Sequence, residues 1–547
     1  MQYPLRLATS AVVAMALIGC ASLPPERGYA DTSDVVEARL GIVPVYRPTL
    51  DAPIDVPTEP LSVDDAIRVA FLHNPRIQQA YARIGIGRAE LEEARRIANP
   101  TFGYAKLSPR TGPGSQITHS LSVEFSEILL LSTRKRFAEA ELARVQNVVA
   151  AELLTLATEV ETAWFTSVSA TLVAQMRSAV ATSAQASADL AQRFFDAGNI
   201  NRLQLEQERA SSVLARIGAV RADAEADRAR SDLANLLGLS SHAPWATHQR
   251  LPAPIAVHMD TDALVASAQS QRLDLVAAQQ AARQREQALG ITRRWRWLGS
   301  IDVGYARESE VDGGENRGPT LALGLPIFNQ GQGALARAQA ELLSARSERD
   351  ALTLAVQNGA RLALEQLRGR YDVAERYRTA LLPSREAIVA RSQEETNFML
   401  MGVFELILAK QAEYDAYQEY LEAVRDYWIA RAQLKREVGG ELPGDAGDPS
   451  ETIGVESILP SAEPPPMDHS MHGMTHDAPS DPHAGHAMPT APADDPHAGH
   501  AMPMPSTTPE DPHAGHHMAP ANEADDEDGE NADDPDEHST HEHGEIP

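Results

Sequence analysis

The chain has 547 residues, of which only 5% are aromatic, and Ala, Leu, Arg, Gln and Glu dominate long stretches, a composition typical of long helices. Residues 441–547 hold −25 of the net charge of −29 and contain no Lys or Arg, so the first 440 residues carry only about −4. The lack of a strongly basic segment argues against nucleic acid as a partner. The chain also contains no nucleophile elbow, P-loop, HExxH, CxxC or dinucleotide-binding motif, and we predict neither an enzyme nor a cofactor.

Residues 1–19 have the pattern of an export signal, with Arg6 followed by an apolar stretch too short to span a bilayer. The stretch ends in Leu17-Ile18-Gly19-Cys20, which resembles a bacterial lipobox. That resemblance implies that Cys20, the only cysteine, is acylated and becomes the new N-terminus. Ala21 after the cysteine suits transfer of the lipoprotein to the outer membrane. The alternative is an ordinary signal peptide with a chance cysteine.

Composition divides the rest of the chain into five segments. Prolines punctuate residues 20–60, which we predict to be an extended, acylated lead. Two helical repeats follow, at 61–240 and 262–440, with a linker at 241–261 between them. Residues 441–547 are rich in Pro, Asp, His and Met and are predicted to be a disordered acidic tail.

The two repeats share an order of elements with landmarks in near register. Gly198 and Gly402 lie 204 residues apart, and the openings of the first predicted helices, at Asn74 and Arg272, lie 198 apart. Each repeat has a helix, two short alternating segments, a long helix, a glycine-containing break and a final helix. The predicted helices of the first repeat are 73–98, 132–195 and 200–237, and those of the second are 272–293, 330–401 with an interruption at Pro383, and 403–439.

The long helices carry a narrow apolar stripe. Leu142, Val145, Val149 and Leu153 are spaced three or four residues apart, as in a coiled-coil seam. A helix of about 64 residues would be about 95 Å long at 1.5 Å per residue. A helix this long and this lightly apolar belongs in a bundle or a tube.

Four segments alternate with period two and predict two β-hairpins. These segments are 100–107, 116–126, 300–307 and 319–327. Their lengths and single apolar faces are typical of transmembrane barrel strands. Trp295 and Trp297, among several arginines, precede the third segment and suit a membrane interface. The alternative is that two solvent-exposed hairpins cap a soluble helical bundle.

No stretch after the export signal approaches the roughly 20 apolar residues of a transmembrane helix, so any spanning structure must be built from strands. Four strands cannot close a barrel, because the smallest barrels of this kind need about eight. Open strand edges are not tolerated in lipid. Several chains must therefore share one barrel, and we predict that the protein oligomerises.

This order of elements, after a lipobox and a proline-rich lead, resembles the TolC-like outer-membrane factors over residues 61–440. The resemblance implies a mainly α fold and a homotrimer, in which three copies supply a shared 12-stranded transmembrane barrel and a periplasmic α-barrel. It also implies a location in the lipid of the outer membrane and docking on a periplasmic adaptor protein and an inner-membrane efflux pump. The turns at 198–203 and 402–407 resemble the family's far tip, where the docking residues would be Gly198, Asn199, Gly402 and Val403.

The tail repeats Asp-Pro-His-Ala-Gly-His-x-Met three times and contains 13 of the 18 histidines and 7 of the 13 methionines. Imidazole suits copper, zinc and nickel, whereas thioethers select soft ions such as Cu(I) and Ag(I). The alternative is a solvated low-complexity tail whose histidines bind nothing. The predicted metal ligands are Met467, His469, Met471, His472, Met474, His476, His483, His486, Met488, His497, His500, Met502, Met504, His513, His516, His517 and Met518.

Together these features predict the outer-membrane channel of a tripartite metal-cation efflux system, in the heavy-metal branch of the family. It would be a passive duct for copper, silver or related metals, with a metal-binding tail in the periplasm. Two alternatives stay open. One is a duct for drugs or secreted proteins, and the other is a coiled-coil lipoprotein that buffers metal and forms no channel.

Overall fold

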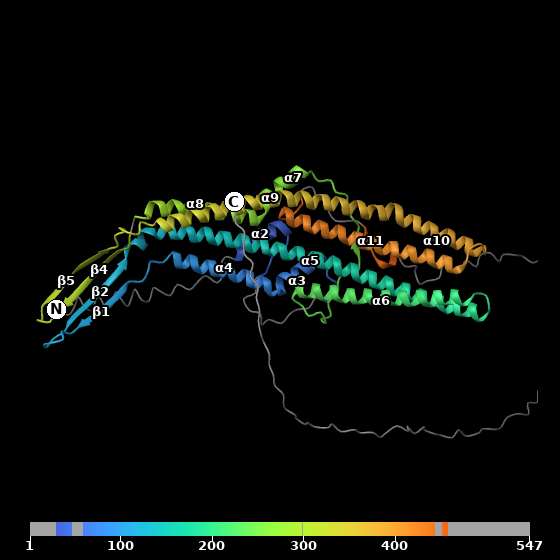
Figure 1. The fold of residues 1–547 in the computed structure, drawn as a ribbon, viewed down its shortest axis with the longest axis horizontal. Helices are drawn as coiled ribbons and strands as arrows, with labels where there is room; N and C mark the ends of the chain where they lie inside the picture. Colours follow the sequence, from blue (N-terminus) through green and yellow to red (C-terminus); the bar gives the residue numbers. More distant parts are fainter. Residues whose placement is uncertain (1–28, 46–57, 298, 443–450, 458–547) are drawn as a thin grey trace, which may run out of the picture. The chain divides into compact units, whose positions relative to one another are not determined.

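The computed structural model describes residues 29–45, 58–297, 299–442 and 451–457 (Figure 1). All of these residues belong to one unit, Met1–Pro465. The second unit, Pro466–Pro547, and the predicted signal peptide lie outside the described residues.

The described chain contains two repeats of one order: two helices, a β-hairpin, a long helical segment and a final helix (Figure 1). The first repeat consists of α3 (Val63–His73), α4 (Pro75–Ala94), β1 (Thr101–Leu107), β2 (Gln116–Glu124), α5 (Phe125–Asp196) and α6 (Arg202–Leu237). The second consists of α7 (Thr261–Gln271), α8 (Leu273–Trp295), β4 (Ile301–Ser309), β5 (Glu315–Leu323), α9 (Gln332–Arg376), α10 (Leu382–Asn397) and α11 (Val403–Val438). None of the helices in the described ranges combines the length and hydropathy needed to cross a lipid bilayer.

The repeats match closely in the lengths of their helices. Helices α3 and α7 have 11 residues each and begin 198 residues apart. Helices α6 and α11 have 36 residues each and begin 201 residues apart. The predicted tandem repeat is therefore present, with a register of 201 residues rather than 204 at its far end.

The last helix of the first repeat ends against the junction between its first two helices. Asn74 caps α4 by accepting a 2.8 Å hydrogen bond from the Arg76 amide, and its side chain donates to the Leu236 carbonyl at 2.7 Å. Gly238 then ends α6 with φ of +71°. A Cβ at Gly238 would lie 2.5 Å from the His73 carbonyl oxygen, so glycine is required both by its φ and by the close approach.

The second repeat uses the same arrangement with different side chains. Gly439 ends α11 with φ of +90°, and a Cβ there would lie 3.0 Å from Arg272 Cα. Arg272 occupies the place of Asn74 and forms ion pairs at 2.6 Å with Asp274 and at 2.5 Å with Glu437. A charged network thus replaces the amide cap of the first repeat.

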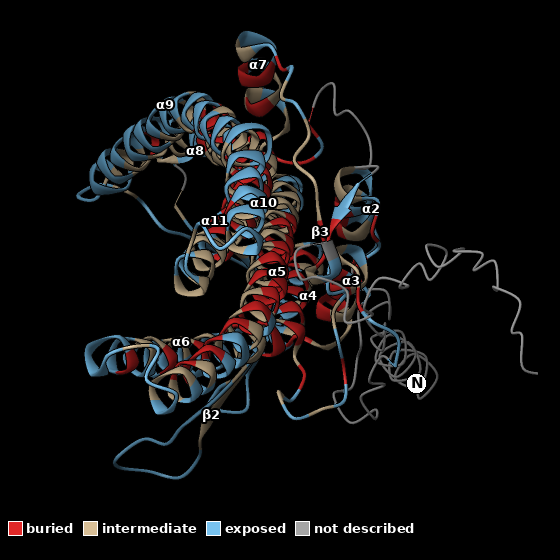
Figure 2. Cartoon of the chain, turned by 90° about the vertical axis from the view of Figure 1, so that its right-hand side faces the viewer, coloured by how far each residue is buried: buried red, intermediate tan, exposed pale blue. Residues whose placement is uncertain are grey.

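The hydrophobic core follows α5, the longest helix at 72 residues. Figure 2 shows buried residues along α5, whereas α9 and α10 are largely exposed on the surface of the chain. The predicted stripe supplies this core, because Leu142, Val149 and Leu153 are all buried and Val145 packs against them. Phe165 of α5 stacks on Trp428 of α11 with ring centroids 5.4 Å apart, which joins the two repeats.

The prediction that residues 20–60 form an extended lead is wrong for part of that segment. Residues Tyr29–Leu40 form a helix, α2, that packs on α5. Its buried residues Tyr29, Thr32 and Val36 lie on one face, and Tyr29 meets Tyr81 edge-on at 5.3 Å. The prolines of the lead flank this helix and do not interrupt it.

The prediction of a wholly disordered tail after residue 440 is also wrong at its start. Strand β6 (Thr452–Ile453) pairs antiparallel with β3 (Leu251–Pro252), within the predicted linker. Trp428 holds this linker against α11, because its indole N–H donates to the Pro252 carbonyl at 2.7 Å. The short Thr-Ile-Gly-Val sequence at 452–455 is the apolar exception that packs within an acidic segment.

Two element boundaries differ from prediction. Strand β5 runs over Glu315–Leu323 instead of 319–327, because the pairing with β4 extends through polar residues toward the turn and ends before Pro326, which has no amide donor. Helix α5 begins at Phe125, directly after β2, rather than at Ser132. The predicted interruption at Pro383 is present as a π-helical turn, Tyr377–Leu381, between α9 and α10.

Candidate functional sites

The two hairpins form one four-stranded antiparallel sheet in the order β1-β2-β4-β5. Strands β2 and β4 pair with each other, so the hairpins of the two repeats join side by side at the end of the molecule where α5 begins (Figure 1). Strands β1 and β5 lie at the edges, and neither has an outer partner among the described strands. The sheet therefore ends in two rows of backbone groups that are free to pair.

Cross-strand register assigns every residue of the sheet to one of two faces, because opposite residues in paired strands share a face. We call the first the apolar face; its members are Phe102, Tyr104, Lys106, Ile117, His119, Leu121, Val123, Ile301, Val303, Tyr305, Arg307, Ser309, Glu315, Arg317, Pro319, Leu321 and Leu323. We call the second the polar face; its members are Thr101, Gly103, Ala105, Leu107, Gln116, Thr118, Ser120, Ser122, Glu124, Asp302, Gly304, Ala306, Glu308, Asn316, Gly318, Thr320 and Ala322.

The faces differ in size and charge as well as in polarity. Nearly every side chain on the polar face is small or polar, and its only charged groups are the carboxylates of Glu124, Asp302 and Glu308. All the basic side chains of the sheet lie on the apolar face, together with a single carboxylate, Glu315. Such a sheet can face lipid on one side and water on the other.

The predicted docking residues lie at the opposite end of α5, in two turns that are close together. Phe194 at the end of α5 meets Phe404 at the start of α11 edge-on, with ring centroids 6.3 Å apart. The structure therefore brings Gly198 and Asn199 of one turn near Gly402 and Val403 of the other. Docking at these residues stays a prediction.

The alignment of the two tips by their glycines is wrong. Gly198 lies at φ +76° just past the end of α5, and the residue in the same place after α10 is Met399, at φ +58°. Gly402 instead precedes α11 at φ −78°, where the first tip has the helix cap Asn201. The physical reason is that the two glycines serve different backbone roles, a left-handed turn and a helix start, which the letters alone do not separate.

The second tip exposes three large apolar side chains, which the sequence identified only as a possible docking surface. Phe398, Met399 and Leu400 are 76%, 93% and 78% exposed, respectively. Met399 is the only non-glycine residue of the described chain with a positive φ. The corresponding residues of the first tip are Ala197, Gly198 and Asn199.

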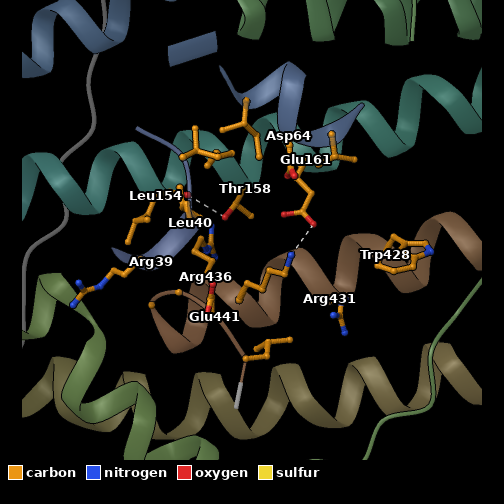
Figure 3. A pocket seen from close by; sticks show the side chains of 18 residues that line it. Arg39, Leu40, Asp64, Leu154, Thr158, Glu161, Trp428, Arg431, Arg436 and Glu441 are labelled. Atoms are coloured by element: carbon orange, nitrogen blue, oxygen red, sulfur yellow. Dashed lines mark hydrogen bonds and ion pairs between the residues drawn. The ribbon is translucent and has the colours of Figure 1, made fainter. Parts of the chain in front are cut away.

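A cavity of about 480 Å³ lies between α2, α3, α5 and α11 (Figure 3). Glu161 of α5, only 8% exposed, forms a 3.4 Å ion pair there with Lys435 of α11. Burial raises the pKa of the Glu161 carboxyl above its usual range, and the nearby Lys435 and Arg431 offset this only in part. The sequence did not indicate this pair, because a single Glu on a long helix has the pattern of a solvated charge.

The remaining predicted sites lie outside the described residues. These are the lipidation site Cys20 and all the histidines and methionines of the predicted metal-binding tail. Within the described ranges, no group of three or more His, Cys, Asp or Glu side chains is placed to hold a metal ion. Metal binding by the tail therefore stays a prediction.

Comparison with known families and with curated proteins gave no match to this chain. Solved structures do match it in fold. A membrane protein from Pseudomonas aeruginosa is 17% identical with a TM-score of 0.59, covering 72% of this chain and 99% of its own. The CmeC outer-membrane channel of Campylobacter jejuni is 16% identical with a TM-score of 0.59, covering 74% and 95%.

A third similar structure is CusC, described in connection with folding and transmembrane channel formation. It is 17% identical with a TM-score of 0.58, and the match covers 73% of this chain and 99% of that one. All three matches span nearly the whole of the other protein, so the likeness includes both the helices and the strands. The chain therefore has the fold of outer-membrane channel proteins.

Proposed function

We propose that this protein is the outer-membrane channel of a tripartite efflux system that exports metal cations, and that it acts as a passive duct and not as an enzyme. The observation that carries this proposal is the sheet with one apolar face, one polar face and two open edges. The open edges call for further copies of the chain. The two faces call for a boundary between lipid and water.

Three copies satisfy the open edges. In lipid, an unpaired backbone amide or carbonyl costs several kcal/mol, so β1 of one copy must pair with β5 of the next until the ring closes. Three copies of a four-stranded sheet give 12 strands, above the minimum of about eight for a closed barrel. The helices of the three copies would then form a tube beneath the barrel, in the periplasm.

The polar face would line the lumen of this barrel. Gly and Ser side chains leave space for water, and Glu124, Asp302 and Glu308 place three carboxylates per copy along the wall with no compensating cation. A lumen with only negative fixed charges favours cations over anions. This supports a cationic cargo, although specificity would reside largely in the pump.

The tail supports a metal as that cargo. Its three His- and Met-containing repeats combine ligands for copper in both oxidation states and for silver, and its acidic residues raise the local concentration of cations. Acylation of Cys20 would hold the chain to the outer membrane. A duct for drugs or secreted proteins would leave these tail ligands without a role.

The tips of the helical tube would dock on a periplasmic adaptor, which connects the duct to an inner-membrane pump. The exposed apolar side chains of Phe398, Met399 and Leu400 support this role, because such side chains gain free energy when a partner covers them. Gly198, Asn199, Gly402 and Val403 shape the backbone of the two turns that would contact the adaptor.

Single-channel conductance of the purified acylated protein in a planar bilayer tests the proposal. We expect discrete channels from a stable trimer with higher permeability to K⁺ than to Cl⁻. The variant Glu124→Gln/Asp302→Asn/Glu308→Gln should lose much of that preference, whereas Glu315→Gln, on the apolar face, should retain it.

Detergent dependence must be measured alongside conductance, since a closed duct would not conduct. A well-folded protein that stays soluble without detergent and never conducts would contradict the channel and favour a metal-buffering lipoprotein. Unchanged copper and silver tolerance after deletion of the gene would favour a duct for another cargo.

A further inference from the structure

The basic side chains of the sheet are concentrated at one level. Cross-strand pairing places Tyr104, His119, Arg307 and Arg317 in one row across all four strands, and Lys106 lies two residues beyond Tyr104 on the same face. We call Lys106, Arg307 and Arg317 the basic rim. It lies toward the turns that connect the strands of each hairpin, away from the helical body.

The charges of the basic rim exceed what the sheet itself can neutralise. Arg307 forms an ion pair with Glu315, the only carboxylate on the apolar face. Lys106 and Arg317 form no ion pair within the described part of the chain, and both are exposed. The rim therefore presents two uncompensated cations per copy on the face that otherwise carries Phe102, Leu121 and Tyr305.

A charge on an apolar face needs a partner that is itself apolar at one end and anionic at the other. From Tyr305 to Arg307 the distance along a strand is about 6.6 Å, so one amphiphile can cover both levels. Its acyl chains would lie on the apolar rows and its headgroup would reach the rim. Arginine binds phosphate oxygens through two parallel N–H donors, which makes a phosphate-bearing headgroup the best match.

We propose that the basic rim binds the phosphate groups of anionic membrane lipids at the level of the hairpin turns, in three equivalent sites around the trimer. This inference rests on the proposed function, because it needs the sheet to be in a membrane. A soluble phosphate is the less suitable ligand, since the apolar rows beside the rim would stay uncovered.

Lipid retention on the full-length trimer, measured by native mass spectrometry with phosphatidylglycerol and phosphatidylcholine, tests the inference. Each basic residue near a charged lipid surface contributes about a fivefold change in affinity, so two per site predict a preference of about 25-fold for phosphatidylglycerol. The variant Lys106→Gln/Arg317→Gln should lose this preference. Arg317→Gln should lose about fivefold, and the matched control Arg110→Gln, in the β1–β2 turn, should lose none.

Two results would overturn the inference while the channel itself stands. One is conducting trimers in which the Lys106→Gln/Arg317→Gln variant keeps the wild-type preference. The other is complete loss of the preference in millimolar inorganic phosphate, which would indicate a soluble phosphate site. A protein that forms no trimer and takes up no lipid would instead contradict the proposed function, and the rim with it.

Discussion

The turn between α5 and α6 and the turn between α10 and α11 follow one backbone path with different side chains. After each helix, two backbone amides bond back to the last helical turn, Asn199 to Phe194 at 2.8 Å and Leu400 to Glu395 at 2.9 Å. The left-handed position is Gly198 in the first turn and Met399 in the second. A side chain other than glycine costs about 1 kcal/mol or more at that position.

This difference shows which of the two turns keeps its side chains for a purpose other than folding. The first tip has the residue that the backbone prefers and presents polar groups to solvent. The second tip tolerates backbone strain and exposes Phe398, Met399 and Leu400. We therefore expect the second tip to supply most of the free energy of docking and the first to supply shape.

The largest expected effect comes from charge on the second tip. Apolar side chains at the centre of an interface contribute about 2 kcal/mol each, which is about 30-fold in affinity. Phe398→Asp/Leu400→Asp should abolish copper tolerance in cells that depend on this protein, while the purified trimer still conducts. The matched control Asn199→Asp/Asn201→Asp adds the same charge to the first tip and retains a capping side chain. Equal loss in both variants would remove the distinction between the tips.

The glycines that end α6 and α11 compare the repeats at their other end. A Cβ at residue 238 would lie 2.5 Å from a backbone carbonyl, whereas one at residue 439 would lie 3.0 Å from a backbone Cα. Gly238→Ala should therefore destabilise by about 3 kcal/mol and Gly439→Ala by about 2 kcal/mol. Thermal unfolding followed by helical circular dichroism measures both, and the reverse order would show that the first junction adapts more easily.

An exchange of residues at the tips tests the backbone strain directly. Met399→Gly should stabilise the second turn by about 1 kcal/mol and weaken docking, while Gly198→Met should destabilise the first turn by a similar amount. Denaturant unfolding of the two variants gives the stabilities. A Met399→Gly protein that is less stable than wild type would mean that the methionine packs within the turn.

The smallest effect concerns an ion pair that only one repeat possesses. Lys435 of α11 meets Glu161 of α5, but the residue 201 positions earlier, in α6, is Ala234. Because the pKa of Glu161 is raised in the folded protein, its protonated form stabilises the fold at low pH, and this contribution is lost as the pH rises through that pKa. Glu161→Gln should flatten the decline of the unfolding midpoint above about pH 4.5.

The control for this variant is Glu159→Gln, because Glu159 lies two residues away and pairs with Arg76 on the exposed surface at 2.6 Å. It should leave the pH profile unchanged. If Glu161→Gln keeps the wild-type slope, another group determines the pH dependence.

Much of the helical body followed from sequence because its signals are local. Stripes spaced three or four residues apart located α5 and α9, and the opening Asn74-Pro75 matched a capped helix start. Helix α2 was missed because flanking prolines dominated the composition of the lead. The extent of β5 depended on pairing with β4, which no local pattern contains.

The candidate sites divide in the same way. Period-two alternation located the hairpins, but only cross-strand register showed that Tyr104, His119, Arg307 and Arg317 share a row. The sign of φ at Gly198, Met399 and Gly402 depends on where each helix ends, so residue identity alone aligned the wrong pair. The ion pair of Glu161 joins residues 274 positions apart and gave no sequence signal.

The π-helical turn at Tyr377–Leu381 has a consequence for insertions and deletions. Buried residues on α9 recur at Leu367 and Ala374, seven apart, but the next, Leu382, comes eight later. The turn absorbs the extra residue and keeps one face of the helix directed at α11. Removal of one residue from this turn should leave a regular α-helix with its packing phase intact, whereas the same deletion near Ala360 would rotate everything beyond it by about 100°.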